Sequence, residues 1–221
     1  MLNASDSEYY EKTKEQALLG EAFENYGVKE YIVVEKNGVK IAITGVFGKD
    51  ALDCVPNCPL VFEDPIEAVK DTVEEIKEEE KVDMIVCVSH SGTWDDAGKS
   101  EDELLAKSVP ELDLIISGHT HTKLEKPIQH GDTYIVSASE YGKYLGDMTM
   151  SQTSKGRWKV DHYELVPVTQ DIQEDANTQA KVDVFMNAVD EKYLSKFGYT
   201  KDQVLCTNEV EFTNSNDADK K

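Results

Sequence analysis

The sequence predicts an α/β fold built around a parallel sheet, and three features support this prediction. Residues 84–88 (MIVCV) and 114–116 (LII) are short apolar runs rich in Ile and Val, which is typical of central strands covered on both faces. Each run leads into a histidine motif, SHSG after the first and SGHTHT after the second. A predicted helix directly precedes the first run, and a helix followed by a parallel strand is the repeating unit of such folds.

A hairpin is expected before that helix. Residues 30–36 and 39–46 are strand-like runs on either side of Asn37 and Gly38, two turn residues that tolerate positive φ. The second run is apolar enough to enter the core. The preceding polar stretch, residues 5–23, is interpreted as a surface loop or a short helix.

The first helix is predicted to begin after Asp64. Asp is a good N-cap, and Pro65 fits the first helical position because the N–H that it lacks would have no partner there. The helix ends in the charged run EEIKEEEK, which indicates a solvated helix end. Its apolar face has helical spacing and comprises Ile66, Val69, Val73 and Ile76.

A second, shorter helix is predicted over residues 101–109. Ser100 and Glu103 have the spacing of a capping box, and Pro110 ends the helix. The loop before it, residues 91–99, follows the SHSG histidine and is expected to form the rim of any site there. That loop carries Trp94, Asp95 and Asp96, of which the two aspartates are interpreted as ordinary loop polarity.

Three alternating segments follow, at residues 133–139, 145–152 and 157–168. Alternation of apolar and polar residues is typical of antiparallel strands with one solvated face, so we expect a second sheet here. His130, beside a turn, and His162, within one of these segments, are expected to be surface residues rather than metal ligands.

The pattern changes near the C-terminus. Residues 171–194 predict one long amphipathic helix that ends at Gly198, and residues 207–221 form a polar tail that is expected to fray. The predicted inner face of the helix comprises Ala180, Val184, Ala188 and Tyr193.

Three histidines lie at the predicted carboxyl ends of the two central strands: His90, His119 and His121. Ligands of layered α/β proteins bind at this edge of the sheet. Neutral imidazole suits zinc, manganese, iron and nickel, and Gly118 allows the backbone to turn sharply beside a ligand. Two metal ions about 3.5–4 Å apart are the usual arrangement for in-line attack on phosphorus.

Composition limits the partners. A chain of 221 residues can form one large domain or a domain plus part of a second. Its formal net charge of −21 disfavours nucleic-acid polymers and anionic membranes, and any phosphate site must be locally positive. No apolar stretch reaches the roughly 18–20 residues of a membrane span, and no signal peptide is present in this chain.

The four cysteines leave the redox state open. Cys54 and Cys58 could form a short disulfide or share a metal, although free thiols are the favoured interpretation. Cys87 lies within a central strand and is expected to be a small buried hydrophobe, while Cys206 lies near the polar tail.

The motif GHTHT after an apolar strand, with SHSG closing the strand before it, resembles the C-terminal half of the calcineurin-like metallophosphoesterase domain. It is most similar to the 5'-nucleotidase and 2',3'-cyclic-nucleotide 2'-phosphodiesterase family. The stretches NGVKIAITGVFG and ASEYGKYLGDMTM extend the resemblance over residues 2–168. The resemblance implies a four-layer αββα sandwich over residues 1–168, followed by a helical linker and polar tail, residues 169–221, toward an absent C-terminal domain.

The same resemblance implies a metal-dependent phosphoesterase that acts on nucleotides or other phosphate esters. Two divalent ions (Mn, Zn, Fe, Ca or Mg) would support attack by a metal-bridged hydroxide on phosphorus. His90 and His119 would bind the second ion and His121 the first. No catalytic residue is assigned in this chain, and the family's habit implies export to the periplasm, cell wall or extracellular space.

The family's upstream motifs D-x-H, G-D-x-x-D and G-N-H-E/D do not occur in this sequence. The chain is therefore expected to be incomplete at its N-terminus, to bind one metal ion or none, and to be inactive alone. The missing strands would leave an exposed sheet edge, which invites self-association. The alternative hypothesis is a non-catalytic acidic module that binds one divalent metal or a protein partner.

Overall fold

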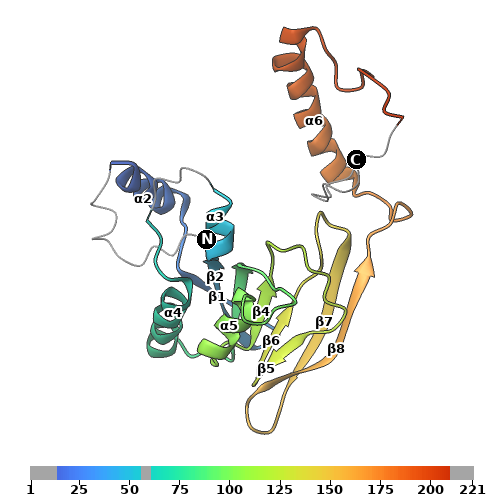
Figure 1. Cartoon of the computed structure of the whole chain (residues 1–221). Coiled ribbons are helices and arrows are strands. Elements are labelled where there is room, and N and C mark those ends of the chain that lie inside the picture. Colours follow the sequence, from blue (N-terminus) through green and yellow to red (C-terminus); the bar gives the residue numbers. More distant parts are fainter. Residues whose placement is uncertain (1–13, 56–60, 210–221) are drawn as a thin grey trace. The chain divides into compact units, whose positions relative to one another are not determined.

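The computed structural model describes residues 14–55 and 61–209 (Figure 1). The chain divides into two compact units, Met1–Thr169 and Gln170–Lys221. The first unit contains both sheets and all helices up to α5. The second contains α6 (Ala176–Lys192) and a short 3-10 helix, η1 (Leu194–Phe197).

The central element is a six-stranded sheet with the order β1-β2-β3-β4-β6-β5. Its four inner strands are mutually parallel, and the two edge strands pair antiparallel to their neighbours. The predicted hairpin turn is confirmed, because Asn37 and Gly38 have φ of 53° and 80°. The strands are β1 (Tyr31–Lys36), β2 (Val39–Phe47), β3 (Met84–His90), β4 (Leu114–Ser117), β5 (Ile128–His130) and β6 (Thr133–Val136).

One prediction about this sheet is wrong. The segment of residues 133–139 was expected in the second sheet, but β6 pairs in parallel with β4. The reason is that both of its faces are apolar and covered: Ile135 is fully buried on the helix side, while Tyr134 and Val136 pack into the core on the other side.

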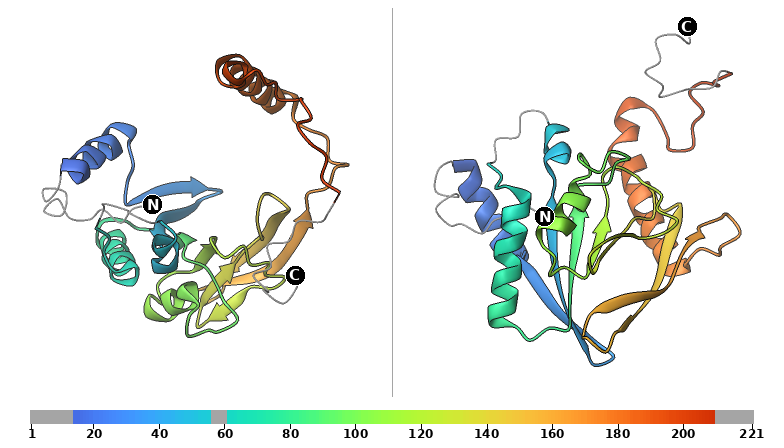
Figure 2. Two further views of the ribbon diagram at one scale, coloured as in Figure 1. Left: turned by 45° about the horizontal axis from the view of Figure 1, so that its top comes forward. Right: turned by 60° about the horizontal axis from the view of Figure 1, so that its bottom comes forward.

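Helices cover one face of the six-stranded sheet (Figure 2). The helix α4 (Pro65–Glu79) begins as predicted, with the Asp64 side chain accepting hydrogen bonds from the backbone N–H groups of Ile66 and Glu67. The main core lies between these helices and the sheet; its fully buried members include Val69, Val73, Ile76, Leu112, Ile115 and Ile135. The other helices of this unit are α2 (Lys14–Tyr26), α3 (Lys49–Asp53) and α5 (Glu101–Ser108).

The capping box predicted for α5 does not form. Ser100 is the N-cap, but its hydroxyl is buried without a hydrogen-bond partner among the described residues. The Glu103 carboxylate pairs with the His130 ring instead, at 2.6 Å. The start of the helix was therefore predicted correctly and the capping contact was not.

A two-stranded antiparallel sheet, β7 (Tyr144–Gln152) and β8 (Trp158–Pro167), covers part of the opposite face. Met148, Met150 and Trp158 pack against Met84, Val86 and Leu114, which forms a second core. The unit is thus layered as helices, sheet and sheet, and the predicted α/β fold is confirmed. At the carboxyl ends of the central strands the cover is incomplete, because Val88 is 47% exposed and Ile116 is 43% exposed.

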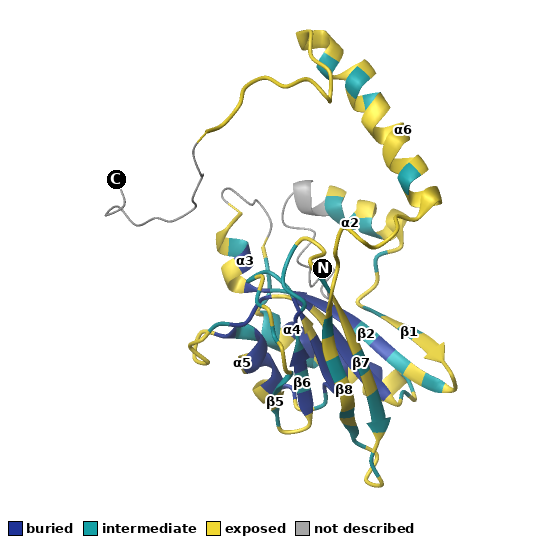
Figure 3. Ribbon diagram, turned by 90° about the vertical axis from the view of Figure 1, so that its right-hand side faces the viewer, coloured by how far each residue is buried: buried dark blue, intermediate teal, exposed yellow. Residues whose placement is uncertain are grey.

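Within its own unit, residues 170–221, the predicted inner face of the C-terminal helix is not covered. No residue of α6 is buried there, and Val184 is 68% exposed (Figure 3). The helix is capped by Asp175, which accepts a hydrogen bond from the Thr178 N–H, and the segment ends at Gly198 in the left-handed conformation. Helical periodicity therefore predicted the element correctly.

Cysteine reactivity gives a test of this core. Cys87 is fully buried in β3, and burial raises the pKa of its thiol far above the usual range, whereas Cys54 and Cys206 are exposed. We expect iodoacetamide at pH 8 to alkylate Cys87 on the order of 10³-fold more slowly than the exposed thiols, because reaction requires unfolding. Peptide mass spectrometry measures each rate, and equal rates in native protein would contradict this packing. Cys58 lies outside the described residues.

Candidate metal centre

Three turns meet where the parallel strands β2, β3 and β4 end. The Gly48 N–H donates to the His90 carbonyl at 3.2 Å, and the Gly118 N–H donates to the Ser89 carbonyl at 2.9 Å. A Cβ on Gly48 would lie 2.6 Å from Ser91 Cα. Any side chain at this position would push the turns apart, so glycine is required there for close approach rather than for unusual φ.

Gly92, just after the first histidine, is constrained in two ways. It has φ of 98°, and a Cβ placed on it would lie 2.4 Å from Thr120 Cγ2. The Thr93 N–H donates to the Thr120 hydroxyl at 3.1 Å, which joins the turn after β3 to the turn after β4. The SHSG and GHTHT motifs are therefore in direct contact.

A buried carboxylate fixes the turn after β3. Asp102, which has no exposed surface, accepts hydrogen bonds from the Ser89 hydroxyl at 2.5 Å and the Gly92 N–H at 3.1 Å. Burial raises the pKa of Asp102, and the hydrogen bonds oppose that rise. Asp102 lies in the first turn of α5, so this helix positions the backbone on both sides of His90.

His90 and His119 are neighbours. Their ring centroids lie 5.0 Å apart with an interplanar angle of 59°, and Phe47 stacks on His90 at 5.6 Å. Burial lowers the pKa of His90, and the adjacent His119 lowers it further. Both effects favour neutral imidazole, which is the form that binds metal.

His121 makes different contacts. Its Nδ1 lies 3.0 Å from the Glu140 carboxylate and its ring lies 5.3 Å from that of Tyr141. The Nδ1 contact leaves Nε2 free, and a carboxylate on the far nitrogen is the usual way in which a metal-binding imidazole is oriented. Of the three histidines predicted as ligands, the structure brings His90 and His119 into direct ring contact and holds His121 beside the segment before β7.

Backbone strain is concentrated at this edge. Four of the five described non-glycine residues with positive φ are in the segments around the histidines: His119, His121, Ser139 and Tyr141. The fifth is in the β1–β2 turn. Such conformations cost of order 1–3 kcal/mol each and cluster at functional sites.

Asp50, which was not predicted from the sequence, and Cys54, for which a shared metal was left open there, extend the centre. The Asp50 carboxylate lies 2.8 Å from His119 Nε2, and donor atoms of Asp50, Cys54 and His119 all lie within 4.8 Å of one another. Oxygen, sulfur and imidazole nitrogen together form a donor set that suits a transition metal. The available signal was the i, i+4 spacing of Asp50 and Cys54 directly after β2, a third strand of the parallel sheet.

The loop of residues 91–99 reaches the centre through its tryptophan. The Trp94 ring lies 6.3 Å from that of His119. Asp96 accepts a hydrogen bond from the Gly98 N–H within its own loop, at 3.0 Å, and Asp95 is exposed. The loop thus forms a rim as expected, and neither aspartate belongs to the donor group of Asp50, Cys54 and His119.

The two remaining histidines lie elsewhere. His130 is half-buried and bound to Glu103, so the expectation that it is a plain surface residue is corrected: it links β5 to α5. His162 is half-exposed on β8, with Glu164 at 3.8 Å. His162, Glu164 and Asp147 form a second group of exposed residues, whose donor atoms lie within 4.8 Å of one another.

Comparison with known proteins identifies the family. The profile of the family described as calcineurin-like phosphoesterase matches residues 4–123, which is more than half of the chain. The chain belongs to this family. Its members are hydrolases that use divalent metal ions, in agreement with the donor groups described above.

Curated relatives narrow the resemblance. The chain is 34% identical over 180 residues to the trifunctional nucleotide phosphoesterase protein YfkN of Bacillus subtilis, covering 79% of this chain and 12% of the relative. It is 32% identical over 165 residues to a 5'-nucleotidase of Vibrio vulnificus, covering 62% of this chain and 30% of the relative. The chain therefore spans less than a third of the length of either protein.

Solved structures agree on the fold. A 5'-nucleotidase precursor from Thermus thermophilus has a TM-score of 0.59 at 24% identity, covering 72% of this chain and 34% of that one. The sulfate thiohydrolase SoxB, also from Thermus thermophilus, has a TM-score of 0.56 at 23% identity, covering 72% and 28%. At this identity the likeness shows the fold alone.

The anchoring role of Asp102 can be tested by substitution. Asp102→Asn replaces one acceptor oxygen with an NH₂ group, which leaves one buried donor without a partner. We expect the free energy of unfolding to fall by about 1–3 kcal/mol in urea denaturation. The matched control is Asp95→Asn, the same change at an exposed position, for which we expect a change within about 0.5 kcal/mol. Equal effects in the two variants would contradict the anchoring role.

Proposed function

We propose that this chain is part of a dinuclear metal phosphohydrolase that acts on nucleotides, of the 5'-nucleotidase or cyclic-nucleotide phosphodiesterase type. The observation that carries the proposal is the contact between the His90 and His119 rings at adjacent strand ends, in a chain of the calcineurin-like phosphoesterase family. Relatives named nucleotide phosphoesterase and 5'-nucleotidase support the substrate class. The net charge of −21 disfavours a nucleic-acid polymer as substrate.

Each histidine has a role in this proposal. His90 and His119 hold one divalent ion and His121 holds the other. Asp50 and Glu140, which contact His119 and His121, orient those two rings. Bound metal ions would supply Lewis acidity toward phosphoryl oxygens and lower the pKa of a water nucleophile. Burial lowers the pKa of His90, which favours the neutral ring, so that no proton has to leave before a metal ion binds.

We propose further that residues 1–168 are the C-terminal part of the catalytic domain and that residues 169–221 link it to another domain. The sequence contains none of the three upstream motifs of the family that it resembles, and in that family one of these motifs provides the carboxylate that bridges the two ions. Without a bridging carboxylate the repulsion between two cations is uncompensated. The isolated chain is therefore expected to hold at most one ion and to have no hydrolytic turnover. We also propose export of the whole protein, which is the habit of the family that the sequence resembles.

A second candidate function is a non-catalytic module that binds one divalent ion. The observation that favours it is the cluster of Asp50, Cys54 and His119, which offers three donors to a single ion. The two candidates differ at the thiol: Cys54→Ser weakens zinc binding if the single-ion module is correct, and leaves it unchanged if the histidines alone hold the ion.

Metal binding and hydrolysis test the proposal together. We expect isothermal titration calorimetry to show one Zn²⁺ or Mn²⁺ ion per chain, with affinity reduced at least about 10-fold in His119→Ala. The comparison variant is His162→Ala, because His162 belongs to the other donor group. Binding that is lost in His162→Ala and kept in His119→Ala would place the ion on the β7–β8 hairpin and refute the assignment.

Hydrolysis of p-nitrophenyl phosphate, bis-p-nitrophenyl phosphate and AMP is measured in the same variants with added metal. We expect no turnover by the chain alone. Metal-dependent turnover that disappears in His119→Ala would support the histidine site while showing that the inactivity argument is wrong.

Self-association through an exposed edge is the remaining part of the proposal. β1 forms one edge of the six-stranded sheet, and Ile32 and Val34 on it are 48% and 38% exposed. We expect sedimentation velocity to show an average mass that rises with concentration, and Val34→Lys to abolish the rise because a charge blocks edge pairing. The control is Leu18→Lys on α2, where Leu18 is 57% exposed. A monomer at all concentrations would contradict this proposal.

A further inference from the structure

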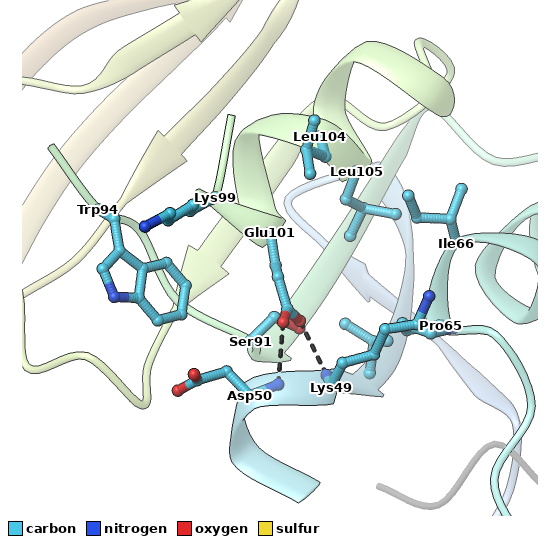
Figure 4. A pocket seen from close by; sticks show the side chains of 11 residues that line it. Lys49, Asp50, Pro65, Ile66, Ser91, Trp94, Lys99, Glu101, Leu104 and Leu105 are labelled. Atoms are coloured by element: carbon cyan, nitrogen blue, oxygen red, sulfur yellow. Dashed lines mark hydrogen bonds between the residues drawn. The ribbon is translucent and has the colours of Figure 1, made fainter. Parts of the chain in front are cut away.

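The first turn of α5 carries consecutive carboxylates, Glu101, Asp102 and Glu103, and each contacts a different element. Glu101 stands in the wall of a cavity of about 370 Å³, where it accepts hydrogen bonds from two backbone N–H groups at the start of α3 (Figure 4). Asp102 accepts hydrogen bonds from the turn after β3. The Glu103 carboxylate lies 2.6 Å from His130 Nε2 on β5.

These contacts fix the start of α5 in both position and rotation. Consecutive residues of an α-helix lie about 100° apart around its axis, so the carboxylates point in three different directions. The helix has no side-chain cap among the described residues, because the Ser100 hydroxyl at the N-cap makes no hydrogen bond there. A helix of eight residues is too short to be stable alone, so its tertiary contacts determine where its first turn lies.

The contact between Glu103 and His130 joins α5 to the buried part of a hairpin. The Glu103 side chain is 9% exposed and the His130 side chain is 24% exposed. An ionised carboxylate only accepts hydrogen bonds, so the His130 Nε2–H is the donor. The hairpin of β5 and β6 is itself fixed, because the buried Thr133 hydroxyl donates to the Leu112 carbonyl at 2.6 Å. His130 therefore ties the start of α5 to the six-stranded sheet.

Glu103 has an alternative partner within its own helix. Ser100 and Glu103 have the spacing of a capping box, in which the glutamate accepts from the serine N–H and the serine hydroxyl accepts from the glutamate N–H. In the structure the Ser100 N–H donates to the Asp96 carbonyl at 3.1 Å instead. Without His130, the Glu103 side chain would be free to turn toward Ser100, which would rearrange the turn that also carries Asp102.

We propose that His130 is a positioning residue for the metal centre. By binding Glu103 it fixes the first turn of α5, from which Asp102 holds the turn that follows His90. His130 belongs to neither donor group found among the described residues, so its effect passes through the helix. The effect on metal binding rests on the proposed function, whereas the effect on the position of the His90 ring does not.

Three substitutions test the proposal. His130→Phe keeps an aromatic ring and removes the donor to Glu103, while His130→Gln restores an N–H donor. The control is Trp158→Phe, which removes the indole hydrogen bond to the Asp83 carbonyl just before β3, at the opposite end of this strand from His90. We expect His130→Phe and Trp158→Phe both to lower the urea midpoint of unfolding, because each leaves an acceptor without its donor.

The first readout is the NMR signal of the His90 ring with a chelator present. We expect His130→Phe to shift this signal and His130→Gln to restore it, because the ring lies against Phe47 and His119 and senses movement relative to either. Trp158→Phe is expected to leave the signal unchanged. The signal is assigned by its loss in His90→Gln.

The second readout is Zn²⁺ affinity by isothermal titration calorimetry. We expect His130→Phe to weaken binding about 3- to 10-fold, with His130→Gln close to the unsubstituted chain and Trp158→Phe unchanged. If His130→Phe does not fold, His130→Asn takes its place, because its shorter amide does not reach Glu103. An unchanged His90 signal in the donor-removing variant, or equal changes in Trp158→Phe, would overturn the proposal.

The outcomes separate this inference from the proposed function. A chain that binds no Zn²⁺ in any variant counts against the proposed function, and the His90 signal under chelation then decides the role of His130. Zn²⁺ binding that depends on His119, together with an unchanged His90 signal in His130→Phe, supports the metal centre and overturns the positioning role.

Discussion

The contact of three strand-end turns is the constraint on which the rest of this structure depends. A Cβ on Gly48 or Gly92 would overlap the neighbouring turn. Asp102 fixes the turn after β3 by accepting two hydrogen bonds, from the Ser89 hydroxyl and the Gly92 N–H. Glycine at these two positions lets the turns approach one another closely, and the His90 and His119 ring centroids lie 5.0 Å apart. Backbone contacts between the turns therefore determine where the imidazole rings lie.

Local sequence signals predicted the helices and strands of the fold, but they did not predict which of these elements pair or pack with one another. Asn37 with Gly38 and the Asp64 cap were right because each depends on a few adjacent residues. β6 was assigned to the wrong sheet because the alternation of apolar and polar residues indicates which side chains of a strand are buried, and does not indicate which strand lies beside it. Val184 was expected on a buried helix face; it is exposed within its own unit, since periodicity predicts a helix face and not the element that covers it.

The residues of the candidate site also divide into those that local motifs predicted and those that only long-range contacts bring to the site. The motifs identified His90, His119 and His121, since strand-end position and residue type are both visible in the sequence. Asp50 was missed because its bond to His119 joins positions 69 residues apart, and only the parallel pairing of β2 with β3 and of β3 with β4 brings them together. Glu140 was missed for a related reason: it follows a residue with positive φ, and sequence does not reveal the direction of such a turn.

The short helix α3 links the metal centre to α5. Five residues cannot hold a helix by their own hydrogen bonds, so external contacts must position it. Glu101 supplies them by accepting the N–H groups of Lys49 and Asp50, and the side chain of the same Asp50 reaches His119. A shift of α3 would therefore move Asp50, a partner of His119. The helix α5 provides both Glu101 and Asp102. Through Asp102 it fixes the turn that follows His90, and through Glu101 it fixes α3, which contacts His119. One helix therefore positions the carboxyl ends of both β2 and β3.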